Sequence, residues 1–178
     1  MDAAKSYKYM PLSIVCGDIT SMRTDAIVNA ANTMLCAGGG VCGAIFRAAG
    51  TAKLQAACEA LHPPIQTGCA VVTEGFSLPA KFIVHTAGPV YHDGAQGEEA
   101  LLRACYANSL AAAANCGCRS IAFPLISSGI YSYPRDKALI AAAGAIREWL
   151  TINESAMDAR LVLFDQETLL LAEELIGE

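Results

Sequence analysis

Short apolar runs rich in β-branched residues recur along the chain and alternate with longer segments of helical periodicity. Six runs are predicted as strands: Leu12–Val15, Ala26–Val28, Ala70–Thr73, Phe82–His85, Ser120–Pro124 and Arg160–Phe164. Four segments are predicted as helices: Gly43–Ala60, Glu98–Asn115, Arg135–Leu150 and Glu167–Ile176. Strands that are apolar on both faces and alternate with helices are typical of a mostly parallel sheet covered on both sides. The pattern therefore predicts a three-layer α/β/α sandwich.

Length and composition predict one globular domain over residues 1–178. The chain has 178 residues, of which 54% are hydrophobic and 16% charged, which excludes an intrinsically disordered protein. No apolar run approaches the roughly 18 residues of a membrane span, and the first ten residues lack the apolar core of a secretory signal. We therefore expect no membrane association and a cytoplasmic location.

The charge balance argues against a nucleic-acid partner. Twelve Lys and Arg against seventeen Asp and Glu give a net charge of −5, and the basic residues are scattered along the chain. Phosphate neutralisation along DNA or RNA needs a basic patch. We expect any anionic ligand to be held by backbone N–H groups without positive side chains. No cofactor or metal is predicted: the eight cysteines are expected to be reduced, and only Cys116 and Cys118 form a close pair.

Ligands of open α/β sheets bind beyond the carboxyl ends of the strands, so the residues that follow each strand are the candidate site. Asp18 follows the first strand. Its carboxylate can accept a hydrogen bond from an exocyclic amine, while a neighbouring backbone N–H serves a ring nitrogen. The alternative is that Asp18 only shapes a turn.

Two amides and a glycine run follow the second strand, in the sequences Asn29-Ala30-Ala31-Asn32 and Gly38-Gly39-Gly40-Val41-Cys42-Gly43. A loop without side-chain bulk lets backbone N–H groups approach a sugar or an oxyanion closely. The helix predicted to start near Gly43 adds the positive end of its dipole, which suits a diphosphate.

The glycine spacing also matches the dinucleotide pattern G-x-G-x-x-G, at Gly38, Gly40 and Gly43. In a Rossmann unit the strand leads directly into the first glycine and an acidic residue ends the next strand. Here the segment Asn29–Ala37 intervenes, and the nearest acidic residue, Glu59, lies in a predicted helix. A nicotinamide-dependent oxidoreductase is therefore the disfavoured interpretation.

A second glycine-containing loop, Leu125-Ile126-Ser127-Ser128-Gly129-Ile130-Tyr131, follows the strand that ends at Pro124. It too can present N–H groups to an anion, with Tyr131 as an apolar face for a sugar. The alternative is an ordinary turn with a core tyrosine. Phe164, at the end of the last strand, could stack on a base, although a core position is the expectation.

These motifs, in this order, resemble the macrodomain family, and most closely its bacterial O-acetyl-ADP-ribose deacetylase branch. The family's marks are Gly17-Asp18-Ile19-Thr20, Asn29-Ala30-Ala31-Asn32, Gly38-Gly39-Gly40-Val41, Val84-His85-Thr86 with Gly88-Pro89, and Ser127-Ser128-Gly129-Ile130-Tyr131. The resemblance covers residues 12–165. It implies a mixed, mostly parallel sheet and a cleft for ADP-ribose at the strand ends.

The resemblance also implies a role for each matched residue. Asp18 would bind the adenine amino group and the Ile19 backbone an adenine ring nitrogen. Asn32 would bind the distal ribose, and the backbone of Gly40, Val41 and Cys42 would follow the ribose and phosphates. The segment Ser127, Ser128, Gly129, Ile130 and Tyr131 would wrap the diphosphate, with Phe164 near the adenine.

Two departures from the family pattern concern catalysis. Relatives that hydrolyse ADP-ribosyl bonds usually carry an aspartate where this chain has Cys42 and a histidine where it has Phe46. A thiol with a pKa near 8.5 is a poor general base at neutral pH, and a missing base typically costs about 10² to 10⁴ in rate. His85 is expected to be a hydrogen-bonded core or loop residue and not a base.

Two functions remain open at this point. The first is hydrolysis of O-acetyl-ADP-ribose or of ADP-ribosyl esters on proteins, with Asn32 and the position of Cys42 as the catalytic candidates. The second is a reader module that binds ADP-ribose, free or on mono-ADP-ribosylated proteins, with little or no catalysis.

Overall fold

The computed structural model describes residues 12–177, and the terminal residues of the predicted single domain lie outside this range. A six-stranded sheet forms its centre, with the strand order β1-β6-β5-β2-β4-β3. The strands are β1 (Ser13–Cys16), β2 (Ala26–Ala31), β3 (Ala70–Glu74), β4 (Phe82–Ala87), β5 (Ser120–Phe123) and β6 (Asp158–Leu163). Only β3, at one edge, is antiparallel to its neighbour, so the predicted mixed and mostly parallel sheet is confirmed.

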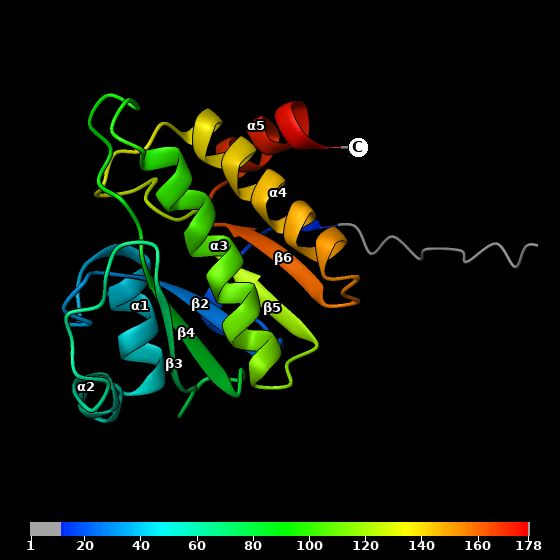
Figure 1. Ribbon diagram of the computed structural model, residues 1–178. Coiled ribbons are helices and arrows are strands. Elements are labelled where there is room, and N and C mark those ends of the chain that lie inside the picture. Colours follow the sequence, from blue (N-terminus) through cyan, green and yellow to red (C-terminus); the bar gives the residue numbers. More distant parts are fainter. Residues whose placement is uncertain (1–11, 178) are drawn as a thin grey trace, which may run out of the picture.

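Helices cover both faces of the sheet, as predicted. The helices α3 (Glu98–Asn115), α4 (Arg135–Ile152) and α5 (Gln166–Ile176) contribute to one apolar core, with α3 and α4 packed against each other (Figure 1). The helices α1 (Gly40–Ala49) and α2 (Thr51–Glu59) contribute to a second core on the opposite face. The fully buried strand residues explain why the strands read as apolar runs: Ile27 and Ile83 pack into one core while Val28 and Val84 pack into the other.

The predicted helix Gly43–Ala60 is wrong in two respects. It begins earlier, at Gly40, and it is divided into α1 and α2 at Gly50. Gly50 has φ +101°, a backbone conformation that residues with a Cβ rarely adopt and that ends an α-helix. The break redirects the chain, so that α1 and α2 pack as separate helices against the same face.

The parallel strands place their carboxyl ends along one edge of the sheet, and the segments that follow β1, β2, β5 and β6 meet there. No helix within residues 12–177 is both long and apolar enough to span a membrane. The eight cysteines are all unpaired.

Candidate functional site

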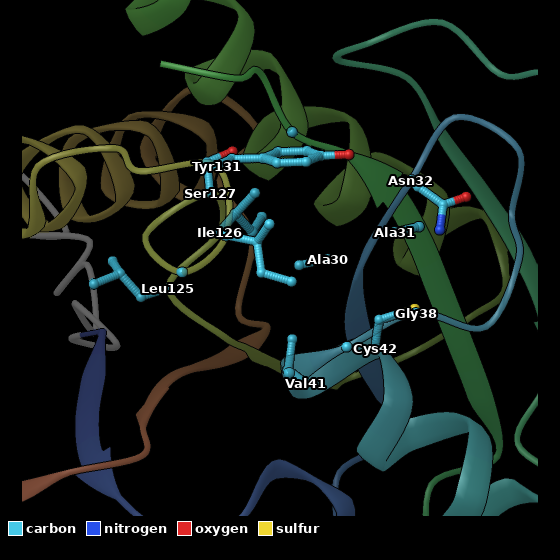
Figure 2. A pocket seen from close by; sticks show the side chains of 15 residues that line it. Ala30, Ala31, Asn32, Gly38, Val41, Cys42, Leu125, Ile126, Ser127 and Tyr131 are labelled. Atoms are coloured by element: carbon cyan, nitrogen blue, oxygen red, sulfur yellow. The ribbon is translucent and has the colours of Figure 1, made fainter. Parts of the chain in front are cut away.

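A cleft with two connected compartments lies at this edge of the sheet. The first compartment, of about 290 Å³, extends from Asn32 and the glycine run to Tyr131 (Figure 2). The second, of about 480 Å³, lies between Asp18 and Phe164. The two share Gly40, Val41, Leu125 and Gly129 as lining residues, so a single elongated ligand could occupy both.

All twelve residues predicted to bind the ligand line this cleft. The first compartment contains Asn32, Gly40, Val41, Cys42, Ser127, Gly129, Ile130 and Tyr131. The second contains Asp18, Ile19, Gly40, Val41, Ser128, Gly129 and Phe164. The fold therefore brings together five chain segments, and the role of each residue toward a ligand remains a prediction.

The glycine run forms one wall of the cleft and leads directly into α1. The N–H groups of Gly40, Val41 and Cys42 have no intramolecular acceptor among residues 12–177, as expected for the first turn of a helix. A Cβ on Gly43 would lie 2.4 Å from the carbonyl oxygen of Gly38, so only glycine permits this close approach of the run to the helix. The result is a free helix N-terminus that faces the cleft and favours a negative charge.

The loop from Ser127 to Tyr131 forms the opposite wall. Its N–H groups at Gly129, Ile130 and Tyr131 likewise find no intramolecular acceptor in the part of the chain that the structure describes. Hydrogen bonds behind the loop fix its path, from Tyr133 N to Ser127 O at 2.9 Å and from Tyr91 N to Tyr131 O at 2.9 Å. Six unpaired N–H groups thus line the two walls, enough to replace the water around a diphosphate.

Asp18 shapes a turn, and it also lines the second compartment. Its Oδ1 accepts hydrogen bonds from Thr20 N at 2.9 Å and from Thr20 Oγ1 at 2.7 Å, which caps the 3-10 helix η1 (Ile19–Ser21). Among residues 12–177 no donor contacts Oδ2. The carboxylate is exposed and lines the second compartment, so one oxygen is structural and the other is available.

The expected core position of Phe164 is wrong. Strand β6 ends at Leu163, one residue earlier than predicted, and Phe164 is 86% exposed. The residue before it, Leu163, is buried at 1% exposure. Since successive side chains of a strand point to opposite faces and the strand has ended, the Phe164 ring lies at the cleft instead of in either core. The alternative, an aromatic face available to a base, is the one that the structure favours.

Positive side chains do line the second compartment, contrary to the expectation that only main-chain amides would hold an anion. Arg47 lies on the same face of α1 as Gly40 and Ala44, and Arg135 is the first residue of α4. Arg135 also forms an exposed ion pair with Glu167, at 3.7 Å. The spacing of Gly40, Ala44 and Arg47 along a helix would have placed Arg47 at the cleft, had the helix start been predicted at Gly40.

Asn32 and Cys42 lie at the end of the first compartment, on either side of Gly38 (Figure 2). The Asn32 amide is held by the backbone of Cys36: its Nδ2 donates to Cys36 O at 2.8 Å, and its Oδ1 accepts from Cys36 N at 3.1 Å. Cys42 is 5% exposed, and its Sγ donates to the same Cys36 O at 3.7 Å. The two catalytic candidates, Asn32 and Cys42, therefore both donate a hydrogen bond to the carbonyl oxygen of Cys36.

Cys42 is a protonated thiol at neutral pH. Burial raises its pKa above the ordinary value, which outweighs the hydrogen bonds from Asn29 and the Gly38 backbone that lower it. A helix N-terminus can lower the pKa of a cysteine and so make its thiol a nucleophile. The pKa of Cys42 is raised, so Cys42 does not meet this condition. Asp, Glu and His are absent from the residues that line the first compartment.

His85 is a hydrogen-bonded core residue, as predicted. It is fully buried in β4, and its ring contacts Asn29 Nδ2 at 3.1 Å and Thr73 Oγ1 at 2.9 Å. Burial lowers its pKa to about 4, so the imidazole is neutral at physiological pH. It does not line the cleft and cannot contact a ligand there.

The fold and the cleft define the class: an α/β/α domain whose elongated cleft runs between two walls with backbone N–H groups that have no acceptor among residues 12–177. The sequence model of the Macro domain family matches residues 28–142. A Macro domain-containing protein of Mesorhizobium japonicum is 48% identical over 159 residues, 88% of each chain. The O-acetyl-ADP-ribose deacetylase of Cronobacter sakazakii is 45% identical over 170 residues, 94% of each chain.

Solved structures agree with these relatives. The Oceanobacillus iheyensis macrodomain with ADP superposes with a TM-score of 0.85 at 40% identity, covering 92% of this chain and 88% of that one. The Trypanosoma brucei macrodomain in complex with ADP-ribose gives 0.84 at 37% identity, over 93% and 69% of the two chains. The chain belongs to the Macro domain family, and the resemblance read from its motifs is confirmed.

Proposed function

We propose that this protein binds ADP-ribose along the whole cleft and hydrolyses its acyl esters, either O-acetyl-ADP-ribose or ADP-ribosyl esters of protein carboxylates. The observation that carries the proposal is the pair of facing walls, the glycine run and the loop Ser127–Tyr131, with their six unpaired N–H groups. A diphosphate between these walls would place a nucleoside in the second compartment and a sugar in the first.

The second compartment suits adenosine. The available Oδ2 of Asp18 accepts from the adenine amino group, the adjacent Ile19 N–H serves a ring nitrogen, and the exposed Phe164 ring offers a stacking surface. Two of the supporting neighbours, a deacetylase of 45% identity and a macrodomain in complex with ADP-ribose, carry this ligand in their names.

The first compartment suits the distal ribose, with Asn32 lining one side of it and Tyr131 the opposite side. In ester hydrolysis, water attacks the carbonyl carbon of the acyl group, and the bond from that carbon to the ribose oxygen breaks. One proton of the water passes to the ribose oxygen and the products are the free acid and ADP-ribose. Because Cys42 is protonated, a diphosphate oxygen of the substrate and the walls of the cleft would orient the water in place of a protein base.

A second function, reading ADP-ribose without turnover, is favoured by one specific observation. The residues that line the first compartment include no carboxylate or imidazole, and its buried position 42 carries a neutral thiol. In this case the protein would bind free or protein-linked ADP-ribose and release it unchanged.

Calorimetry with ADP-ribose and chromatographic assay of O-acetyl-ADP-ribose turnover separate the two functions. We expect micromolar binding and slow turnover, with Cys42→Asp raising the rate by about 10²-fold because it supplies a general base. Binding without any turnover, followed by turnover in Cys42→Asp, would establish the reader. A folded protein that ignores millimolar ADP-ribose would refute both.

A further inference from the structure

A continuous chain of hydrogen bonds runs beneath the cleft from β3 to the loop that holds Asn32. It starts at Thr73, passes through His85 and Asn29 to Cys42, and ends at the carbonyl of Cys36. Thr73, His85, Asn29 and Cys42 are all buried, at 7%, 0%, 0% and 5% exposure. Asn29 belongs to the motif Asn29-Ala30-Ala31-Asn32 but does not line the cleft, and the proposed hydrolysis does not use it.

The hydrogen bonds in this chain form one consistent set of donors and acceptors. When Thr73 Oγ1 donates its proton to Glu74 O, at 3.2 Å, it accepts from His85 Nε2–H, at 2.9 Å. His85 Nδ1 then carries a lone pair and accepts from Asn29 Nδ2 at 3.1 Å. With His85 in this tautomer, a flipped Asn29 amide would place Oδ1 against the Nδ1 lone pair, so the tautomer of His85 and the orientation of the Asn29 amide are linked.

The second proton of Asn29 Nδ2 points to Cys42 Sγ, at 3.7 Å. A sulfur that accepts from one side is left to donate its own proton on the other, and Cys42 Sγ donates to Cys36 O at 3.7 Å. The same Cys36 O accepts from Asn32 Nδ2, and Cys36 N donates to Asn32 Oδ1. These hydrogen bonds thus connect the buried strand β4 to the amide of Asn32, a residue that lines the first compartment, which we call the distal compartment from here on.

The orientation of Asn29 is maintained at a cost. Its Oδ1 is buried and has no hydrogen-bond partner within residues 12–177. A buried carbonyl oxygen without a partner is destabilising, and apolar residues of the same size would avoid that cost. The amide is therefore explained by what its two N–H groups hold, one on His85 and one on Cys42.

We propose that Asn29 is a positioning residue of the distal compartment: through Cys42 Sγ it fixes the Cys36 peptide and thereby the Asn32 amide that binds the distal ribose. The inference rests on the proposed binding of ADP-ribose and names how its distal half is recognised. Asn29 makes no contact with the ligand itself. The adenosine compartment lies outside its reach, so only the part of the ligand beyond the diphosphate should respond to it.

The test compares the affinities for ADP-ribose and for ADP, which lacks the distal ribose, by calorimetry. In Asn29→Leu, which keeps the fork at Cγ and removes both donors, we expect the preference for ADP-ribose over ADP to fall about five- to tenfold, the scale of one lost hydrogen bond. Affinity for ADP should stay within about twofold, since the walls and the adenosine compartment are unchanged.

Thr86→Val is the matched control. Thr86 is also fully buried in β4, next to His85, but its Oγ1 donates to Cys69 O at 2.8 Å on the other side of the sheet. This variant loses a buried hydrogen bond of similar strength and leaves the hydrogen bonds between Thr73 and Cys36 unchanged. We expect it to lower the melting temperature while leaving the ratio of the two affinities unchanged.

A double-mutant cycle tests whether Asn29 acts through the sulfur. Cys42→Ala alone should lower the ratio as well, and Asn29→Leu combined with Cys42→Ala should lower it no further than the larger single effect. Additive losses, or an unchanged ratio in a folded Asn29→Leu protein, would overturn the proposal. Should Asn29→Leu fail to fold, an unchanged ratio in Cys42→Ala overturns it equally. If the wild-type protein binds neither nucleotide, the proposed function is refuted. If it binds ADP-ribose, but the ratio of the affinities for ADP-ribose and ADP is the same in Asn29→Leu, only this inference is refuted.

Discussion

A substitution of Asp18 provides the sharpest test of the proposed recognition of adenine by the cleft. Its two carboxylate oxygens have different tasks, since Oδ1 caps η1 through Thr20 and Oδ2 is available to the ligand. Asp18→Ala would remove both. Asp18→Asn keeps an oxygen for Thr20 and places an amide N–H₂ where the available oxygen was, so a donor would face the amino group of adenine.

The expected loss follows from the exposure of the group. A charge-assisted hydrogen bond contributes about 1.5 to 3 kcal/mol, and because Asp18 is exposed we expect the lower end of this range. Affinity for ADP-ribose should therefore fall roughly tenfold in Asp18→Asn. The analogue with hypoxanthine in place of adenine carries a carbonyl oxygen at the same ring position. Its affinity should rise in the variant, because the new donor meets an acceptor.

Calorimetry with both nucleotides measures this exchange of preference, and thermal unfolding reports the cap. Asp93→Asn is the matched control, because Asp93 Oδ1 accepts from Ala95 N at 2.9 Å, the same two-residue turn geometry as Asp18 with Thr20 N, but outside the cleft. If Asp18→Asn weakens both nucleotides equally, Asp18 recognises no exocyclic group and its role is confined to the turn.

Three further predictions concern the walls and the rim of the cleft. In Gly43→Ala the new Cβ would lie 2.4 Å from Gly38 O, so the glycine run must shift. We expect the free energy of unfolding, measured by chemical denaturation, to fall by about 1 to 3 kcal/mol and the binding of ADP-ribose to weaken. An unchanged affinity would show that the run is not a wall of the site. Phe164→Ala should weaken ADP-ribose by about 0.5 to 1.5 kcal/mol with almost no change in melting temperature, since the ring is 86% exposed; a clear loss of stability would return the ring to a structural role. The carboxylate of Glu98 is desolvated, which raises its pKa, but the backbone N–H groups of Glu98 itself, Gln96, His92 and Gly94 outweigh this and hold the pKa at about 2, below the ordinary 4.5. Its stabilisation is therefore present above pH 4.5 and lost as the pH falls toward 2, and melting curves across this interval should show that loss in the wild type and not in Glu98→Gln.

The expectations that succeeded depended on local patterns. Strands such as Phe82–His85 were found because both of their faces are buried, and the helix Glu98–Asn115, which lies between Gly97 and Gly117 with their positive φ, was found to the residue. The candidate site followed from one topological fact, namely that parallel strands bring their carboxyl ends to a common edge. For that reason Asp18, the glycine run and the loop after β5 could be grouped before any distance was known.

The expectations that failed concerned single residues at boundaries. Phe164 was placed in the core because the last apolar run was extended by one residue, and a shift of one position at the end of a strand exchanges buried for exposed. Arg47 was missed because the helix start was placed three residues late, so that Gly40, a residue of the glycine run, was not recognised as sharing a helix face with it. Gly50 was taken as an ordinary helix residue, although its positive φ separates α1 from α2.

The sequence by itself determined the layered α/β fold, the edge of the sheet that carries the site and the family, because periodicity and the order of motifs are properties of the chain alone. Only the tertiary structure decided that Cys42 is a buried and protonated thiol, that Phe164 faces the cleft, and that Asn29, His85 and Thr73 form one chain beneath Asn32. The physical reason is that burial and hydrogen-bond direction depend on contacts between β2, β3, β4 and α1. These segments are separated in sequence by up to 56 residues, from Asn29 to His85, and no local pattern encodes their meeting.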